Sequence, residues 1–384
     1  MHRKSVYLLV LAVAALLVLG LVMLYSTGAY ARDAHGDPYF FLKRQAMWLG
    51  VGMIFCVSAA RLDYHFWQKT WLLWFGLSVV LLILCFVPHI GMKVNGSYRW
   101  LNLRVMQFQP SELAKLAAVC TLAWWFSLDN EASNEFFRGF VYPFMVVGIL
   151  MLLISREKDL GATALIGLTT YGVMFVAGTR WRYLVPIVVI AVMGLTFAVM
   201  HMPDRVNRMM AFLHPNEYPV SFYQQLQGLI AFGSGGTEGL GLGNGRQKIG
   251  FLPEAHTDFI FPTIGEELGL RCTLGVVFVY VVIIITATVI ATHSRDRFGL
   301  LMGFGIVMLL ALQAAVNIGV TTAVMPNKGM PLPFISYGGS NLVFCMLCLG
   351  ILINIYRQGM SDREQQAVNV KMAVRTRRRR PVRI

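Results

Sequence analysis

Long apolar stretches separated by short polar connections run through most of the chain. An apolar stretch of about 17–25 residues is long enough to cross the hydrocarbon core of a bilayer as a helix. The pattern therefore predicts an all-α polytopic membrane protein with about ten transmembrane helices. The expected spans, some of them short or flanked by polar residues, are Val6–Tyr25, Gln45–Ala60, Trp71–Val87, Leu113–Ser127, Phe140–Ile154, Gly161–Ala177, Tyr183–Met200, Leu270–Ala291, Gly299–Ala323 and Gly339–Tyr356.

The composition is also typical of a protein that is embedded in a lipid bilayer. Hydrophobic residues make up 57% of it and charged residues only 14%, against about a quarter charged in soluble domains. These values exclude an ordinary cytosolic enzyme, a disordered protein and a small disulfide scaffold. The six cysteines lie in or beside apolar stretches, where small apolar packing is their expected role.

Positive charge predicts the orientation in the membrane. The formal net charge is +14, and much of the excess lies in the arginine-rich tail. Further arginines flank short connections: Arg180, Arg182, Arg295 and Arg297. The positive-inside rule then places both termini in the cytoplasm. We expect residues 1–357 to form the transmembrane domain and residues 358–384 a basic cytoplasmic tail. Nucleic acid is not an expected partner of so apolar a chain.

One connection is much longer than the others and falls on the outer side, between the seventh and eighth expected spans. It covers residues 201–269 and carries Arg205 and Arg208, which lie one turn apart if helical. Its stretch 233–245 holds seven glycines in thirteen residues. Such a loop can cradle a phosphate with backbone N–H groups, but a flexible hinge fits the pattern equally well.

Ionisable residues alternate with large apolar ones at the end of this loop. His256 and Asp258 are candidates for acid–base chemistry. No set of histidines and cysteines has the spacing of a zinc site. A carboxylate-held magnesium beside a pyrophosphate remains an open alternative, with Asp258 as the residue considered for it.

Two further polar segments interrupt the apolar pattern on the outer side. Glu112 and Lys115 are three residues apart at the mouth of a span, where a functional role is favoured over a local ion pair that anchors the helix. Residues 325–340 contain Lys328 and Ser336 among prolines and glycines. This segment is either the re-entrant wall of a site or a simple loop.

Four motifs together resemble the SEDS (shape, elongation, division and sporulation) family, which includes FtsW, RodA and SpoVE. The resemblance covers nearly the whole chain. The motifs are Gln109-Pro110-Ser111-Glu112, Gly241-Leu242-Gly243-Asn244-Gly245, Leu252-Pro253-Glu254-Ala255-His256-Thr257-Asp258-Phe259-Ile260-Phe261 and Pro333-Phe334-Ile335-Ser336-Tyr337-Gly338-Gly339-Ser340.

The resemblance implies a peptidoglycan glycosyltransferase that polymerises lipid II at the outer face of the bacterial inner membrane. The chain looks most like FtsW, which implies septal synthesis with a class B penicillin-binding protein (FtsI-like) and other divisome proteins as partners. An elongation or sporulation polymerase of the RodA or SpoVE type is the alternative. A lipid II flippase and a division scaffold are rivals from other functional classes.

Family positions implied in catalysis fall on Asp258, Glu112 and Lys115. The resemblance and the polar pattern together give these candidates for substrate binding: Trp100, Arg205, Arg208, Gly243, Asn244, His256, Lys328 and Ser336. Asp258 is the expected base, which takes the proton of the attacking hydroxyl while the anomeric carbon inverts. We expect no firm metal site, although magnesium or manganese could take part. No organic cofactor is expected.

Overall fold

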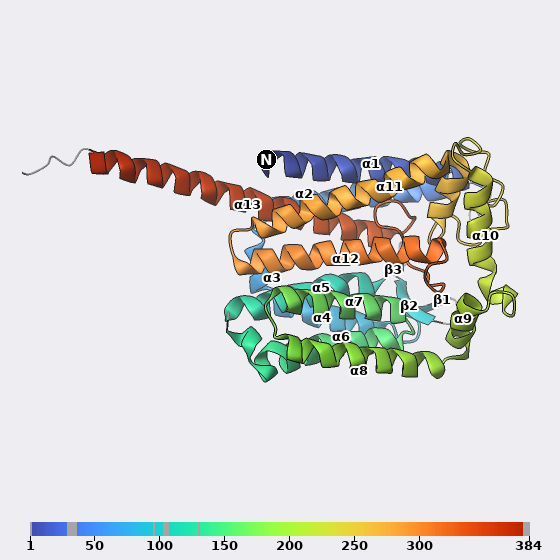
Figure 1. Cartoon of the computed structure of the whole chain (residues 1–384), viewed down its shortest axis with the longest axis horizontal. Helices are drawn as coiled ribbons and strands as arrows, with labels where there is room; N and C mark the ends of the chain where they lie inside the picture. Colours follow the sequence, from blue (N-terminus) through green and yellow to red (C-terminus); the bar gives the residue numbers. More distant parts are fainter. Residues whose placement is uncertain (1, 29–36, 95–96, 103–106, 130, 379–384) are drawn as a thin grey trace, which may run out of the picture.

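The computed structural model describes residues 2–28, 37–94, 97–102, 107–129 and 131–378. Most of them form helices that run alongside one another (Figure 1). These helices are α1 (His2–Gly28), α2 (Phe40–Arg61), α4 (Trp71–Leu84), α5 (Pro110–Leu128), α6 (Tyr142–Arg156), α7 (Leu160–Val176), α8 (Trp181–Met200), α11 (Ile260–Thr292), α12 (Arg297–Thr321) and α13 (Gly339–Arg378). Each expected span overlaps one of them.

Within the described residues, six helices are long and apolar enough to cross a membrane. They are α1, α2, α6 together with the π-helical turn Phe137–Val141 before it, α11, α12 and α13. The apolar helices α4 and α7 are shorter. The chain is thus a multi-pass membrane protein, and the total of ten spans stays a prediction.

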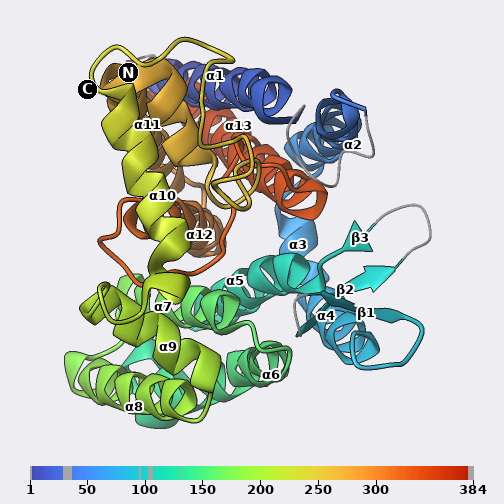
Figure 2. The ribbon, with the colours of Figure 1, turned by 90° about the vertical axis from the view of Figure 1, so that its right-hand side faces the viewer.

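α12 lies at the centre of the bundle and packs against α11 on one side and α5 and α7 on the other (Figure 2). Its buried residues include glycines and leucines on several faces as well as Gln313 and Asn317. A helix that is apolar all round is expected in a buried position. The two buried amides are therefore available to bind neighbouring segments inside the protein.

A small antiparallel sheet lies at one end of the bundle, which we call the site end. Its strands are β1 (Gly91–Val94), β2 (Ser97–Asn102) and β3 (Gln107–Phe108), in the order β1-β2-β3. The all-α prediction was wrong here. Asn95-Gly96 between the first two strands is a strong hairpin signal in the sequence, but the strands are too short to show a clear alternation of apolar and polar residues.

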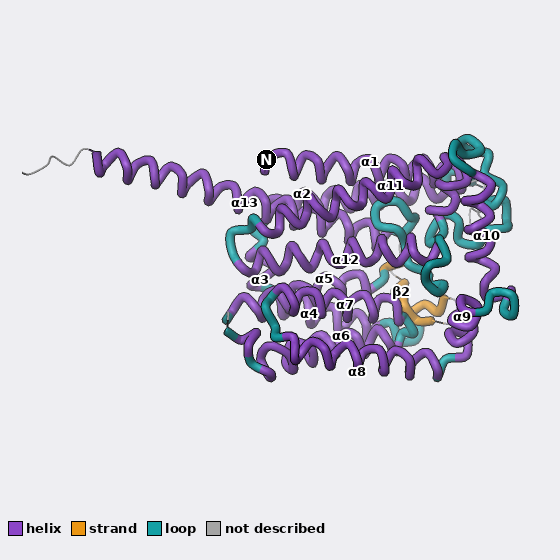
Figure 3. The backbone as a smooth tube through the Cα atoms, in the orientation of Figure 1, coloured by secondary structure: helices purple, strands orange, loops and turns teal. Residues whose placement is uncertain are grey.

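The long connection also departs from the expected loop 201–269. Residues 203–213 and 219–235 form α9 (Pro203–Leu213) and α10 (Pro219–Gly235), each with proline in its first turn, where a missing N–H costs nothing. Both helices run across the site end, where loops also gather (Figures 1 and 3). α11 begins at Ile260, ten residues before the expected start at Leu270. The apolar pattern missed this part because charged residues occupy it.

A kink at Gly269 divides α11. Gly269 has φ 76°, a left-handed conformation that favours glycine. The kink leaves the carbonyls of Glu266 and Glu267 outside the regular helical pattern, and Leu240 N and Gly241 N donate to them at 2.9 Å each. The start of α11 is in this way joined to residues 236–250, which we call the glycine-rich loop.

At the opposite end of the bundle, α13 continues as one helix to Arg378 (Figure 1). It passes the expected boundary between residues 357 and 358 without a break. The last six residues of the expected basic tail, 379–384, lie outside the described residues.

Candidate active site

The loop that carries Asp258 lies at the site end, directly before α11. Three successive carbonyl oxygens of this loop accept hydrogen bonds from residues far away in the sequence. The pairs are His256 O with Tyr337 N (3.0 Å), Thr257 O with Ser336 Oγ (2.7 Å), and Asp258 O with Asn317 Nδ2 (2.8 Å). The backbone at Asp258 is therefore fixed by α12 and by residues 326–340, which we call the proline–glycine segment.

The proline–glycine segment is accordingly a wall of this site, and the simple-loop alternative does not describe it. Ser336 is buried, and its hydroxyl also accepts a hydrogen bond from Leu332 N at 2.8 Å. Asn317 Nδ2 donates to Met330 O at 2.6 Å as well as to Asp258 O. Ser336, expected to bind substrate, is engaged here in holding the two segments together.

Charged side chains from three other elements lie around Asp258. Asp159 caps the N-terminus of α7 by accepting a hydrogen bond from Ala162 N at 3.1 Å. Lys328 Nζ lies 3.1 Å from Asp159 Oδ1, and Arg99 Nη1 of β2 lies 4.0 Å from Asp159 Oδ2. Asp159 thus holds two cations at the edge of the site.

A third cation joins this group from α9. Arg205 Nη2 donates to the backbone carbonyl of Lys158, and Arg99 Nη2 donates to the same oxygen at 2.9 Å. We call Arg99, Arg205 and Lys328 the cationic cluster. Its members come from β2, α9 and the proline–glycine segment, so only the folded chain brings them together.

Asp258 has a pKa suited to proton transfer near neutral pH. Burial and the neighbouring charge of Glu254 raise its pKa from the ordinary value to about 7, although Lys328 acts in the opposite direction. For Asp159, burial acts to raise the pKa, but the charges of Lys328 and Arg99 outweigh it and bring the pKa down to about 2. The two carboxylates therefore differ: Asp159 stays ionised, and Asp258 titrates around neutrality.

Glu112 and Lys115 form a buried ion pair inside the bundle. Lys115 Nζ lies 2.7 Å from Glu112 Oε2, and their side chains are only 3% and 7% exposed. Asn341 Nδ2 donates to Glu112 at 3.1 Å, and Lys115 donates to Gln313 Oε1 at 3.1 Å. Gln313 in turn donates to Pro331 O at 2.9 Å. The pair therefore reaches the proline–glycine segment through Gln313.

The glycine-rich loop binds carboxylates of the protein itself. Gly243 N donates to Glu267 Oε2 at 2.9 Å, and Lys248 Nζ lies 2.6 Å from Glu267 Oε1. Arg246 N donates to the buried Glu266 at 2.7 Å. Gly243, expected to bind substrate, therefore has its N–H engaged internally. Asn244 Nδ2 donates to Leu240 O at 3.1 Å, so this side chain also stabilises the loop.

The remaining candidates lie at the site end in different settings. Trp100 is half-buried on β2, where it pairs with Met92. The ring of His256 packs 4.3 Å from the ring of Phe41 (centroid to centroid) and 5.9 Å from that of Tyr337. Arg208 is exposed on α9 and lines a cavity of about 410 Å³.

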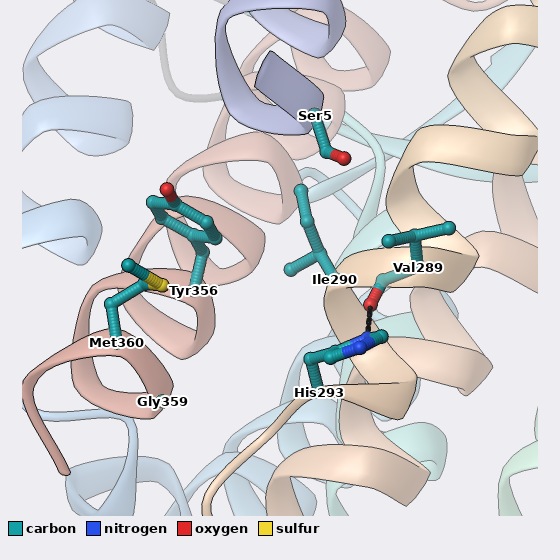
Figure 4. A pocket seen from close by; sticks show the side chains of 7 residues that line it. All are labelled: Ser5, Val289, Ile290, His293, Tyr356, Gly359 and Met360. Carbon is teal, nitrogen blue, oxygen red and sulfur yellow. Dashed lines mark hydrogen bonds between the residues drawn. The ribbon is translucent and has the colours of Figure 1, made fainter. Parts of the chain in front are cut away.

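Another pocket lies near the opposite end of the bundle, between α1, α11 and α13 (Figure 4). Its volume is about 10 Å³, roughly the room that one water molecule needs. His293 Nδ1 within it lies 2.7 Å from Val289 O. This pocket is too small for an organic substrate.

Within the described ranges, no group of three or more histidines, cysteines, aspartates or glutamates is placed to hold a metal ion. Asp258 has the carboxylate of Glu254 as a neighbour, but Lys328 and Arg99 also face it. The chain's own residues therefore do not make a fitting cation site at Asp258, and we derive no step through a metal.

A family model described as a cell cycle protein, FtsW/RodA/SpoVE, matches residues 7–360. The probable peptidoglycan glycosyltransferase FtsW of Geobacter metallireducens is 38% identical over 92% of this chain and 95% of the relative. The chain belongs to the FtsW/RodA/SpoVE family. Stage V sporulation protein E of Bacillus subtilis, also similar, is 37% identical over 91% of this chain and 96% of the relative.

Solved structures of related proteins share the fold of this FtsW/RodA/SpoVE member. One is a chain of a peptidoglycan synthase complex that coordinates polymerization and crosslinking, with a TM-score of 0.76, 27% identity, and coverage of 91% of this chain and 97% of that one. Another is the rod shape determining protein RodA of Thermus thermophilus, with a TM-score of 0.67, 27% identity, and coverage of 91% and 95%.

Sequence reasoning missed Arg99 and Asp159 in this FtsW/RodA/SpoVE member. Asp159 stands between two expected spans, where it reads as an ordinary polar connection. A lone aspartate just before an apolar helix is an N-cap signal, and that signal places it at a helix terminus. Nothing in the sequence places Lys328 beside it, because the two residues are 169 positions apart.

Proposed function

We propose that this chain polymerises lipid II into glycan strands of the septal cell wall, at the outer face of the bacterial inner membrane. The chain is a peptidoglycan glycosyltransferase of the FtsW/RodA/SpoVE family. The observation that carries the finer proposal is the position of Asp258: its pKa is raised to about 7, and it lies beside Lys328 and the other cations of the cationic cluster.

In the proposed reaction, Asp258 acts as the general base. Its carboxylate takes the proton of the acceptor sugar's 4-hydroxyl as that oxygen bonds to the anomeric carbon of the donor. The bond from the anomeric carbon to the diphosphate oxygen breaks, and its electron pair leaves with the lipid diphosphate. Direct displacement inverts the carbon, so a second carboxylate nucleophile is not needed.

The cationic cluster stabilises the leaving diphosphate. Arg99, Arg205 and Lys328 provide guanidinium and ammonium donors, which bind phosphate oxygens strongly. Asp159 balances two of these charges before substrate arrives and keeps them in place. Cations arranged before the reaction starts need no reorganisation when negative charge develops, which lowers the barrier.

The fixed backbone around Asp258 supports this role. Three consecutive carbonyls of its loop are hydrogen-bonded to α12 and the proline–glycine segment. A base must be held within a fraction of an ångström of its productive position for efficient proton transfer. Glu112 and Lys115 take part through Gln313, which connects their ion pair to the same segment.

The proposed setting is a division complex. Both termini are cytoplasmic, the site end faces outward, and a class B penicillin-binding protein supplies the crosslinking activity, together with other divisome proteins. Support comes from the FtsW relatives and from the similar chain in a peptidoglycan synthase complex. The proposal also includes a divalent cation, magnesium or manganese, that arrives bound to the diphosphate of the substrate and not to a site of the chain.

The proposal is tested with the purified chain in complex with its cognate penicillin-binding protein in detergent. Labelled lipid II is supplied, and glycan ladders are resolved on a gel. We expect ladders from the wild type and none from Asp258→Asn, which removes the base but keeps the shape. Glu238→Gln is the control, because Glu238 is an exposed carboxylate at the same end and forms an ion pair with Arg271, which is also exposed.

Ladders from Asp258→Asn at the wild-type level contradict the assignment of the base. Their absence from the wild type, in a complex that is folded and intact, contradicts polymerase activity and favours a flippase or a scaffold.

A role in elongation or sporulation is the second candidate, favoured by the similarity to Stage V sporulation protein E. Depletion of the chain in its host separates these roles. Filamentous cells that fail to divide support the septal role. Rounded cells, or normal growth with defective spores, support the alternative.

A further inference from the structure

The cavity of about 410 Å³ at the site end lies between α9, α10, the loop before α11 and the proline–glycine segment. Figure 2 looks onto this end and shows α9 and α10 crossing it. Polar side chains dominate the lining: Asn207, Arg208, Ser221, Tyr223, Gln224 and Asn327. A volume of this size is within the range of small-molecule sites.

Hydrogen bonds link the lining of the cavity to two segments of the candidate active site. Gln224 Nε2 donates to Pro253 O at 3.1 Å, and Gln224 Oε1 accepts from Asn327 Nδ2 at 3.0 Å. Pro253 belongs to the loop that carries Asp258, and Asn327 directly precedes Lys328. Gln224 thus joins the two segments that hold the base and one cation of the cationic cluster.

Some polar side chains of the lining form no bond to other parts of the protein among the described residues. Among the residues that the structure describes, the side chains of Asn207, Arg208 and Ser221 make no hydrogen bond or ion pair. Arg208 alone offers five N–H donors in a planar fork. By contrast, Arg99, Arg205 and Lys328 are engaged around residues 158 and 159. The cavity therefore presents unengaged donors to whatever enters it.

We infer that this cavity is a sugar subsite, which binds an N-acetylated amino sugar of the lipid-linked substrate and anchors a carboxylate of its attached peptide on Arg208. The inference rests on the proposed function and names residues for one part of its substrate. Side-chain amides and a hydroxyl match the hydroxyl and acetamido groups of such a sugar. The ring of Tyr223, half-exposed at 40%, offers an apolar face.

The chemistry of the lining argues against the other parts of the substrate. A lipid chain prefers an apolar groove, whereas these side chains are mainly amide, hydroxyl and guanidinium groups. A diphosphate carries several charges and fits the three cations of the cationic cluster better than the single Arg208. A polar, mostly neutral group with one carboxylate is the match that remains.

The test uses the full chain in its complex with the penicillin-binding protein. Lipid II is titrated with the wild type, Arg208→Ala and the double variant Asn207→Ala/Arg208→Ala. We expect KM to rise about tenfold for Arg208→Ala, the typical effect of losing a hydrogen bond to a charged group, and further for the double variant. The turnover number should stay within about twofold, because neither residue touches the reacting atoms.

Arg246→Ala is the matched control. Arg246 is an exposed arginine of the glycine-rich loop at the same end, and it donates to Glu266 through its backbone N–H, which the substitution keeps. The change removes the same charge away from the cavity, so KM should stay at the wild-type value. Thermal unfolding of every variant shows whether the fold is retained.

A direct binding measurement separates this inference from the proposed function. The probe is a water-soluble disaccharide–pentapeptide without lipid or diphosphate. We expect the wild type to bind it and Arg208→Ala to bind it about tenfold more weakly. Unchanged KM and unchanged probe binding in both variants overturn the sugar subsite, even if the wild type polymerises lipid II.

Two further outcomes are decisive. Loss of the penicillin-binding protein from Arg208→Ala, with probe binding intact, overturns the subsite and makes the cavity a protein interface. Probe binding that depends on Arg208 in a wild type that forms no glycan ladder supports the subsite and contradicts the polymerase.

Discussion

Lys328 Nζ lies 3.1 Å from Asp159 Oδ1, although 169 positions separate the two residues in the sequence. The aspartate also caps α7, and the lysine belongs to the proline–glycine segment. A Cβ at Gly161, in the first turn of α7, would collide with Lys328 Cε, so a larger residue at this position would make the end of the lysine side chain move. The pair joins the helical bundle to the wall of the site, and its two charges act in opposite directions on the pKa of Asp258.

Polymerisation should depend on pH through Asp258. Its pKa is about 7 because burial and Glu254 destabilise the charged form. A general base must be deprotonated, so the rate should rise with pH, reach half of its maximum at a pH of about 7 and level off above that pH. Glycan synthesis from lipid II between pH 5 and 9 provides the measurement. A rate that is flat from pH 5 to 7 would contradict a base of this pKa.

Neutralising the charges around Asp258 should shift this pH profile in opposite directions. Lys328 lowers the pKa of Asp258, and Asp159 raises it. Lys328→Met should therefore move the midpoint to higher pH, and Asp159→Asn should move it to lower pH. Asparagine also caps helices well, so the N-terminus of α7 should remain intact. The residual rates of both variants are measured across the same range, with Glu238→Gln as the control.

Shifts in the same direction for both variants would show that their charges do not act on the base. An unshifted midpoint in both would assign the titration to another group.

Glu157 should make the folded state less stable as pH rises. It is 1% exposed, and its carboxylate has only a weak donor, the thiol of Cys85, as a side-chain partner among the described residues. Burial raises its pKa from 4.5 to about 8. Between these two values the folded chain keeps a proton that the unfolded chain has lost, so stability falls as pH increases.

Glu157→Gln removes this titration and keeps the shape. We expect the Tm of the wild type in detergent to fall more between pH 5 and pH 9 than the Tm of the variant. Parallel Tm curves for the two proteins would show that Glu157 does not hold a proton in the fold.

Removing one partner of the buried pair Glu112–Lys115 should lower stability more than replacing both partners by neutral residues. Removing one partner of a buried ion pair leaves an uncompensated charge, at a cost of about 3–5 kcal/mol. Glu112→Gln and Lys115→Met should each lower the Tm, and the double variant should regain part of the loss. Thermal unfolding in detergent provides the comparison.

The same variants test the predicted catalytic role of the pair. We expect polymerisation to recover in part in the double variant, since side chains that are 3% and 7% exposed act through the proline–glycine segment. A stable double variant without activity would instead give one of the two residues a direct part in the chemistry.

Gly269→Ala should destabilise the kink in α11. Gly269 has φ 76°, and a Cβ there would meet backbone atoms of Gly239 and Thr237. We expect a loss of more than about 1 kcal/mol in the free energy of unfolding. Gly275→Ala in the same helix is the control, because a Cβ there meets nothing within 4 Å. Equal Tm values for the two variants would contradict a strained backbone at Gly269.

The helices of the bundle could be predicted because the residues of each segment are enough to indicate a helix. An apolar stretch long enough to span a bilayer must satisfy its own backbone hydrogen bonds, and a helix does this within the segment. For α8, the expected start at Tyr183 and the observed start at Trp181 differ by only two residues. The sheet was missed because its strands are too short to give a clear alternation of apolar and polar residues. The start of α11 was missed because charged residues interrupt its apolar pattern.

Asp258 was also identified from the sequence, through a motif that resembles a known family. Its pKa of about 7 depends on burial and on the charges of Glu254 and Lys328, which the folded chain brings around it. The same reasoning assigned Gly243 to substrate, whereas its N–H binds Glu267. A glycine-rich motif shows that backbone groups approach something closely, but not whether the partner is a ligand or the protein's own carboxylate.

The sequence by itself therefore determined the helical, apolar segments and the family, and it selected Asp258 as the candidate base, because each of these depends on residues adjacent in the chain. Only the tertiary structure brought Arg99, Arg205 and Lys328 together around residues 158 and 159 and fixed the carbonyls beside Asp258 from two distant segments. The physical reason is that charge and hydrogen bonding act over a few ångströms in space. Packing of the bundle decides which residues come within that range.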